Sequence, residues 1–419
     1  MDGPMRERTR ALRRSLLGIA AMVVFLLFAV GCGDDDEDAG ATGGTESADT
    51  AAAPKGKPIV IGMAVAKSGF AEAFDWPPAQ AAVLAVDDIN AAGGVLDRPL
   101  KVVIEDTKSE LDLGGPAAAR TIQKGAQVGV VTCDLNLAGP AALEFAKNDM
   151  VSMSTCAGDP AFRDLSPFAF SAGVANPAEA AGAADWASQE GYKKAYVIHD
   201  TTLSYYVTWA AAFKRTFEHF GGEVVGEDRF KSTDPSVAPQ ITRLRELEDE
   251  PDLIVMCSQT SLGGPTLIRQ IRAAGIDTPI LMCVGMQGKS WLASVPGLEN
   301  AYVTAYSDFT GDDENPKVND IAERFVEEYG QPDNSHPIEG YGAIEILVEA
   351  IKRAGTAEGP ALRAELEKFD KVDVASGATT FTPEWHISFD RHVVIQEIKD
   401  GEQTSVARVT PKKVFYPDE

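Results

Sequence analysis

The chain has 419 residues, 44% of them hydrophobic, and a formal net charge of −25 at pH 7. This length favours two domains and is ample for buried cores. The strongly negative charge argues against a nucleic-acid partner, whose phosphates would repel it, and it suits a soluble exported protein.

The first segment joins a basic start to a short apolar run. The run, Leu16–Val30, follows several arginines and is shorter than the roughly twenty residues that a membrane-spanning helix needs. Small residues then precede Cys32, although Ala29 stands where leucine is commoner. This pattern is typical of a secretory signal and resembles a bacterial lipobox. We therefore predict a signal peptide at 1–31 and lipidation of Cys32, with an uncleaved anchor or a buried helix as alternatives.

An acidic stretch follows the cysteine. Residues 32–57 are mostly Asp, Glu, Gly, Ala, Ser and Thr, a composition that stays disordered. We predict a flexible tether there. The folded region is then expected outside the cell, anchored by its N-terminal lipid to the outer face of the cytoplasmic membrane.

Short apolar strands alternate with helices in two successive blocks. The first block has strands at 58–65, 100–106, 128–132, 150–155 and 167–173, with helices at 80–94, 115–127 and 138–149. The second block has strands at 194–200, 222–230, 252–258, 279–283 and 301–307, with helices at 177–190, 205–220, 236–248 and 263–274. This alternation predicts an α/β fold with two doubly wound parallel-sheet lobes.

The last hundred residues break this rhythm. Helices are expected at 317–330, 338–355 and 361–369, followed by a hairpin at 392–409 that turns near Asp400. These elements are expected to cover the two sheets.

Four further cysteines end or follow strands in pairs, one pair in each block: Cys133 and Cys156, then Cys257 and Cys283. Successive strands in such sheets are usually neighbours, so each pair can bridge two strand ends. We predict two disulfides, with four buried free thiols as the alternative. No CxxC occurs and no histidine has zinc spacing relative to a cysteine, so we predict neither a metal nor a cofactor.

No motif points to catalysis. The exported part contains no GxSxG, HExxH, P-loop or GxGxxG sequence. His199 and Asp200 end a predicted strand, where an active site can lie, but such a pair more often makes a loop-end hydrogen bond. We therefore predict a protein that is not an enzyme.

Several segments resemble the branched-chain amino-acid type of periplasmic substrate-binding protein. "IVIGMAVAKSGF" and "LAVDDINAAGGVLDRPLKVVIED" resemble the opening of that family, and "KKAYVIHD", "LIRQIRAAGI", "EGYGAIEILVEAIKRAG" and "TTFTPEWH" follow in the family's order. The resemblance covers about residues 58–410. It implies the solute-binding component of an ABC importer, which is commonly a lipoprotein in Gram-positive bacteria.

The resemblance also implies a monomeric clamshell joined by three crossing strands. Lobe 1 is expected at 58–174 plus 308–384, and lobe 2 at 175–307 plus 385–419. A small molecule would bind in the cleft at the carboxyl ends of the strands, and hinge closure would trap it for a permease. The alternative is a surface sensor of the same fold that presents its ligand to a receptor.

Cleft residues are expected in the loops after the strands. Aromatic contact is expected from Phe74 and Trp76, with the lobe core as the alternative, and the amides near Leu135, Asn136 and Leu137 could bind an anion or a carbonyl. The other candidates are Cys156, Ala157, Gly158, Ala175, Ser204, Tyr205, Tyr206, Gln287 and Tyr341, of which Tyr341 also suits the core. Asp75, Asp134, Asp200 or Asp308 could also supply a carboxylate.

Departures from the family pattern bear on the ligand. The family's hydroxyls for an amino-acid carboxylate fall at Leu135 and Gly158, and its two acids for the ammonium fall at Ala175 and Gln287. A tyrosine of the family falls at Ser204, just before Tyr205 and Tyr206. Burying an ammonium group without an acidic partner is costly. We therefore expect an apolar, aromatic or amide-bearing small molecule rather than a zwitterionic α-amino acid.

Overall fold

The computed structural model describes residues 54–234 and 236–417. The predicted signal peptide, Cys32 and most of the predicted tether lie outside these residues. In the described part of the chain, no helix combines the length and the apolar character that crossing a membrane requires.

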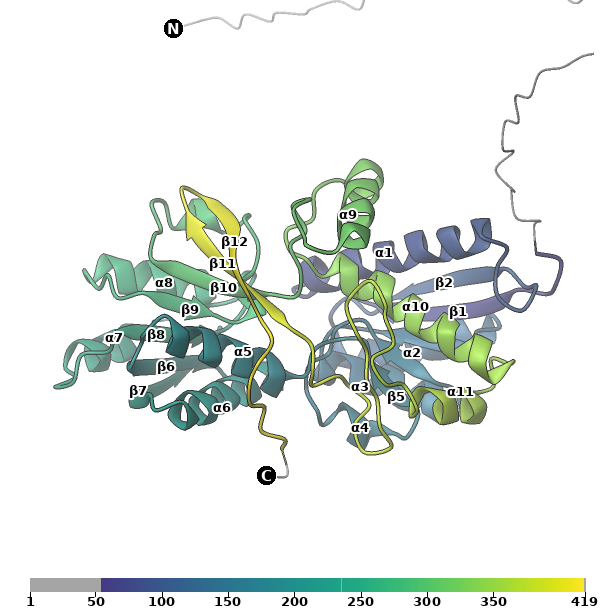
Figure 1. Ribbon diagram of the computed structural model, residues 1–419, viewed down its shortest axis with the longest axis horizontal. Coiled ribbons are helices and arrows are strands. Elements are labelled where there is room, and N and C mark those ends of the chain that lie inside the picture. Colours follow the sequence, from purple (N-terminus) through teal and green to yellow (C-terminus); the bar gives the residue numbers. More distant parts are fainter. Residues whose placement is uncertain (1–53, 235, 418–419) are drawn as a thin grey trace, which may run out of the picture. The chain divides into compact units, whose positions relative to one another are not determined.

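The first lobe, whose strands β1, β2 and β5 are labelled in Figure 1, is built on a five-stranded parallel sheet in the order β2-β1-β3-β4-β5. Its strands are β1 (Ile59–Val65), β2 (Leu100–Asp106), β3 (Val128–Val131), β4 (Ser152–Ser154) and β5 (Ala169–Ser171). The helices between them are α1 (Glu72–Ala91), α2 (Leu111–Gln123), α3 (Leu135–Ala146) and α4 (Phe162–Leu165). The strands β1 and β3 are nearly continuous apolar runs because helices cover both faces of the sheet.

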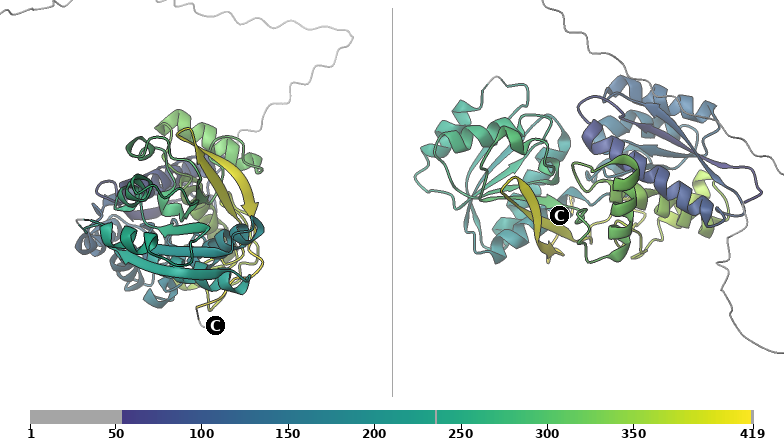
Figure 2. Two further views of the ribbon diagram at one scale, coloured as in Figure 1. Left: turned by 90° about the vertical axis from the view of Figure 1, so that its left-hand side faces the viewer. Right: turned by 90° about the horizontal axis from the view of Figure 1, so that it is seen from above.

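The second lobe is built on a seven-stranded sheet in the order β12-β11-β10-β9-β8-β6-β7. Its strands are β6 (Lys194–Asp200), β7 (Glu223–Phe230), β8 (Leu253–Cys257), β9 (Ile280–Met282), β10 (Ala301–Ala305), β11 (Val393–Lys399) and β12 (Glu402–Val409). The hairpin β11–β12 joins antiparallel to β10 and lies along one edge of the sheet in both views of Figure 2. The helices are α5 (Asn176–Gln189), α6 (Ser204–His219), α7 (Ala238–Arg245) and α8 (Gly264–Ala273).

Three later helices return to the first lobe: α9 (Pro316–Tyr329), α10 (Pro337–Ala354) and α11 (Gly359–Leu366). The helix α10 packs against α1, and both contribute to the largest apolar core. At Gly340 a Cβ atom would lie 1.9 Å from the carbonyl oxygen of Pro78, so only glycine allows this close contact between the two helices.

The chain crosses between the two sheets after β5, after β10 and before β11. Two crossing segments run side by side, because the amide of Ala175 donates to the carbonyl of Ser388 at 2.9 Å. The prediction of two α/β lobes joined by a hinge is confirmed. The residue boundaries given for the lobes stay a prediction.

One local prediction differs from the structure, and another is confirmed. The segment after β1 was expected to be a loop, yet α1 begins at Glu72 and carries Pro77 and Pro78 near its start. Each of these prolines removes one backbone hydrogen bond, and the Ala73 carbonyl, which Pro77 cannot serve, accepts from the Asn334 side-chain amide at 2.9 Å instead. The predicted disulfides Cys133–Cys156 and Cys257–Cys283 are confirmed, with Cα atoms 4.6 Å and 5.0 Å apart.

Candidate ligand-binding site

A partly open cavity of about 60 Å³ lies between the carboxyl ends of the two sheets. A water molecule needs roughly 10–15 Å³ of such space, so this arrangement suits a compact ligand. Hydrogen bonds bridge the lobes around the cavity. The Ser204 hydroxyl lies 3.2 Å from Asn136 Oδ1, and the Ser261 hydroxyl donates to the Phe70 carbonyl at 2.9 Å.

The start of α3 forms part of the first-lobe wall. Asp134 is the N-cap of this helix, and its Oδ1 accepts hydrogen bonds from the amides of Asn136 and Leu137 at 2.8 Å and 3.0 Å. A carboxylate at an N-cap satisfies donors that would otherwise be open. These two amides are therefore not free for an anion, and the geometry gives that prediction no support.

Three carboxyl groups line the first-lobe side of the cavity: Asp75, Asp134 and Asp159. Asp75 is fully buried and accepts hydrogen bonds from the amides of Cys133, at 2.9 Å, and Ala66. Burial raises the pKa of Asp75 to about 7. Burial and the nearby charge of Asp159 raise the pKa of Asp134 to about 6, because both disfavour the charged form.

The second-lobe wall carries two tyrosines from the first turn of α6. The Tyr205 hydroxyl donates to Glu179 at 2.9 Å, and the Tyr206 hydroxyl donates to Gln259 Oε1 at 2.7 Å. Glu179 is fully buried and also accepts from the Val284 amide at 3.0 Å and the Thr304 hydroxyl at 2.6 Å. Burial raises the pKa of Glu179, against these hydrogen bonds. The Glu179 carboxyl group therefore links Tyr205 and Val284 of the cavity wall to Thr304 by hydrogen bonds.

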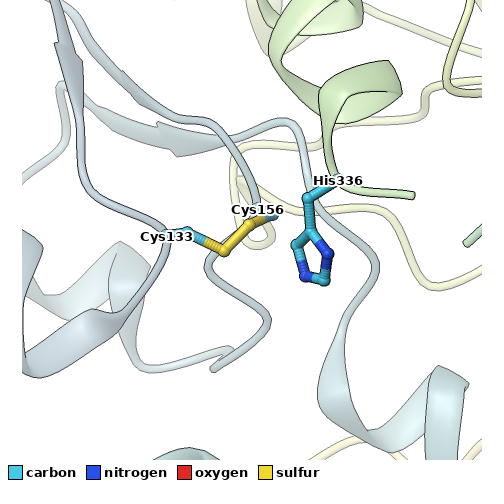
Figure 3. Close-up of side chains that lie close together, drawn as sticks. All are labelled: Cys133, Cys156 and His336. Carbon is cyan, nitrogen blue, oxygen red and sulfur yellow. A yellow bond between two sulfur atoms is a disulfide. The ribbon is translucent and has the colours of Figure 1, made fainter. Parts of the chain in front are cut away.

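The disulfide Cys133–Cys156 lies beside the His336 ring (Figure 3), and all three residues line the cavity. The Nδ1 of His336 lies 2.9 Å from Asn334 Oδ1, which also accepts the His336 amide. Nδ1 therefore carries the proton and Nε2 is an acceptor. Burial lowers the pKa of His336 to about 3, so the ring is neutral. The sulfurs and a ring nitrogen lie within 4.8 Å of one another, but a disulfide offers a metal no thiolate.

Some of the sequence-predicted residues meet at this cavity and others do not. Those that line it are Phe74, Leu135, Leu137, Cys156, Gly158, Tyr205 and Tyr206. Asn136 and Ser204 instead bond to each other across the cleft. Ala157 and Ala175 are fully covered but are not part of the lining.

Three predicted residues are held elsewhere by specific partners. The Tyr341 hydroxyl donates to Asp88 at 2.7 Å, and its ring lies in the first-lobe core. Trp76 lies beneath the Lys67 ammonium, 4.6 Å from the ring centre. Gln287 accepts from the Ser335 hydroxyl at 2.9 Å and donates to Gln396.

Sequence reasoning missed several lining residues, among them Asp159, Gln259, Tyr306 and His336. Gln259 closely follows the end of β8, and Asp159 lies in a turn already assigned to the cleft, so the strand-end argument could have found both. Tyr306 lies in the segment that crosses between the lobes after β10, and His336 lies just before α10. No local sequence pattern marks either position as part of a site.

The chain matches the family described as periplasmic binding protein over residues 58–403. It is 26% identical over 336 residues to Leu/Ile/Val-binding protein homolog 3 of Brucella melitensis biotype 1, covering 77% of this chain and 87% of the relative. It is 24% identical over 328 residues to Leu/Ile/Val-binding protein BraC3 of Rhizobium johnstonii, with the same two coverages.

Solved structures share the fold at low sequence identity. The branched-chain amino acid transporter substrate-binding protein LivJ of Streptococcus pneumoniae, in complex with isoleucine, has a TM-score of 0.74 and 21% identity, covering 84% of this chain and all of LivJ. A solute-binding protein of an ABC transporter from Rhodopseudomonas palustris BisB5, in complex with 3,4-dihydroxybenzoic acid, has a TM-score of 0.71 and 19% identity, covering 86% and 99%. The resemblance found in the sequence is confirmed, and this chain belongs to the periplasmic binding protein family.

Proposed function

We propose that this protein is the solute-binding component of an ABC importer, which traps a small molecule between its lobes and delivers it to a permease. The observation that carries the proposal is the cavity with walls from both lobes. Hydrogen bonds cross the cleft beside it, as expected for a hinge protein in its closed form.

Attachment to the membrane is part of the proposal. The sequence around Cys32 supports a lipid anchor. The acidic segment after it supports a flexible tether between this anchor and the folded part of the protein, which would be a monomer outside the cytoplasmic membrane. Metabolic labelling with a fatty-acid analogue should mark the wild-type protein and leave Cys32→Ala unmarked. Labelling of the variant would contradict the anchor.

The ligand is proposed to be a small apolar, aromatic or amide-bearing molecule rather than a zwitterionic α-amino acid. At position 158 a Cβ atom would lie 2.8 Å from the backbone carbonyl oxygen of Val174 and 2.0 Å from Asn176 Oδ1, so the hydroxyl-bearing residue expected in the family would require the chain to shift here. Leu135, at the other expected hydroxyl position, is apolar and also lines the cavity.

A thermal-shift screen of the full-length protein in detergent tests ligand binding. A ligand at a hundred times its dissociation constant should stabilise the fold by about 2.7 kcal/mol. The panel should contain aliphatic amino acids, aromatic acids, amides, amines and alcohols. Binding of leucine, isoleucine or valine at micromolar affinity would refute the proposed ligand class while leaving a binding protein.

Uptake separates an importer component from a sensor. Deleting the gene should abolish cellular uptake of the radiolabelled ligand if the protein feeds a permease. Unchanged uptake with a lost transcriptional response would instead establish the sensor alternative. Restoring the wild-type gene is the control.

A further inference from the structure

The charged side chains that line the cavity within the described residues are all acidic. Asp75, Asp134 and Asp159 line it, and the lining contains neither lysine nor arginine. Burial is the main cause that raises the pKa of Asp75 and of Asp134, and the charges of Asp134 and Asp159, respectively, add to it. Like charges placed close together destabilise one another, and the residues that line the cavity supply no positive charge to compensate them.

Two of these carboxyl groups each have one oxygen that is not hydrogen-bonded by the described part of the protein. Asp134 Oδ1 accepts a hydrogen bond from the Asn136 amide. Asp159 Oδ1 accepts one from the Ala161 amide at 3.0 Å. In residues 54–234 and 236–417, the Oδ2 atoms of both side chains make no hydrogen bond or ion pair. Asp159 is only 5% exposed and lines the cavity, so a partner for its Oδ2 would have to lie in the cavity.

Two other buried side chains present unpaired polar atoms to the same space. His336 is 2% exposed, and its Nε2 can only accept a hydrogen bond. Tyr306 is 5% exposed and lines the cavity, and no described residue bonds to its hydroxyl. A bound molecule that brings N–H donors would satisfy the acceptors, whereas a carboxylate would add a further acceptor.

We propose that the ligand is a small organic cation, with an ammonium or amidinium group facing Asp134 and Asp159 and an apolar body against Phe74 and Tyr205. This inference rests on the proposed function and narrows its ligand class. The aromatic rings favour a cation electrostatically as well as providing apolar contact. A ligand carboxylate would meet three acids and no base, which disfavours both simple organic acids and zwitterions.

Calorimetry with head-group series tests this charge preference on the full-length protein. The first series is benzylamine, benzyl alcohol and benzoate, and the second is 3-methylbutylamine, 3-methylbutanol and 3-methylbutanoate, with leucine as a zwitterion. Within each series the apolar body is constant, so the head group decides. At pH 7.5 we expect the amine to bind at least tenfold more tightly than the alcohol, and the carboxylate not to bind.

Two isosteric variants test which residues recognise the cation. Asp134→Asn and Asp159→Asn keep an oxygen for the amides that each side chain caps, so the fold should be retained. Each should weaken amine binding at least tenfold, and the exposed Asp370→Asn should leave it unchanged. Equal amine affinity in all three variants would overturn the proposal.

The outcomes separate this inference from the proposed function. Tighter binding of benzoate, leucine or an alcohol than of the amines would overturn the cation and keep a solute-binding protein. Amines that fail to bind would overturn the cation as well. The uptake experiment then decides the proposed function independently.

Discussion

The cavity wall from the first lobe carries carboxyl groups, whereas the wall from the second lobe carries phenols and an amide. Asp134 and Asp159 each leave one oxygen without a partner in the described structure. In contrast, the hydroxyls of Tyr205 and Tyr206 are bonded to Glu179 and Gln259. The first lobe therefore offers unsatisfied acceptors to a ligand, and the second offers a fixed, mostly aromatic surface.

This difference suggests a division of labour between the lobes. The first lobe would select the ligand's charge, and the second would enclose its apolar body on closure. The following predictions test this division, from the largest expected effect to the smallest.

Removing the carboxyl behind the second-lobe wall should have the largest effect. Glu179→Ala leaves the donors of Tyr205, Val284 and Thr304 without their acceptor, and each buried orphan costs about 1–3 kcal/mol. We expect the free energy of unfolding in urea to fall by about 4 kcal/mol. Glu190→Ala, at the exposed end of the same helix, should change it little; equal losses would show that Glu179 does not support the wall.

The two disulfides form a matched pair for comparing the lobes. They close loops of similar length, with sequence separations of 23 and 26, so replacing either pair with serine should cost about 3 kcal/mol of stability. Only Cys133 and Cys156 line the cavity. Ligand affinity, measured by calorimetry below the unfolding temperature, should therefore fall for that pair alone. Equal losses of affinity would contradict a local role.

The contribution of Asp134 to the free energy of unfolding should depend on pH. Its pKa is raised to about 6 in the folded protein, against an ordinary value of 3.8, so the folded state binds the proton more tightly. Its contribution is most favourable below about pH 4 and is lost as pH rises through 6. Relative to Asp134→Asn, the wild type should lose on the order of 1 kcal/mol between pH 4 and pH 7. A constant difference across urea titrations in this range would refute the shift.

The helix cap is expected to contribute less. Asp134→Ala removes the acceptor for the Asn136 and Leu137 amides and should cost about 1 kcal/mol at pH 7, whereas Asp134→Asn keeps the cap and should cost less. Chemical denaturation of the two variants side by side measures the difference. Equal losses would show that the cap does not stabilise α3.

The smallest effect is expected at the contact across the cleft. Ser204→Ala removes the hydroxyl bond to Asn136, which is worth about 1 kcal/mol at most in an exposed position. Ligand affinity should fall about two- to fivefold with little change in the unfolding temperature of the unliganded protein. A marked drop in that temperature would mean that the bond stabilises the lobe rather than its closure.

The sequence was informative where periodicity and strand ends carried the argument. Alternating strands and helices predicted both lobes, and cysteines at successive strand ends predicted both disulfides. Placing residues by family order was less informative, because order does not report the direction of a side chain. Gln287, for example, turns toward Ser335 and Gln396 rather than the cavity.

Residues brought in by the crossing segments were beyond sequence reasoning. Tyr306 and His336 reach the cavity because the chain leaves one lobe and enters the other beside it. Their position depends on tertiary packing that no local spacing encodes. The capping role of Asp134, by contrast, follows from a carboxylate placed just before a helix and could have been expected.

The position of the first disulfide also determines when the cavity is completed. Cys133 and Cys156 are separate thiols when the chain leaves the ribosome, and the cavity acquires its final covalent wall only when they are oxidised. Oxidation belongs to the compartment outside the cytoplasm. The cavity wall is therefore completed only after export. A copy that stayed in the reducing cytoplasm would lack the Cys133–Cys156 bond, and its cavity would be incomplete there.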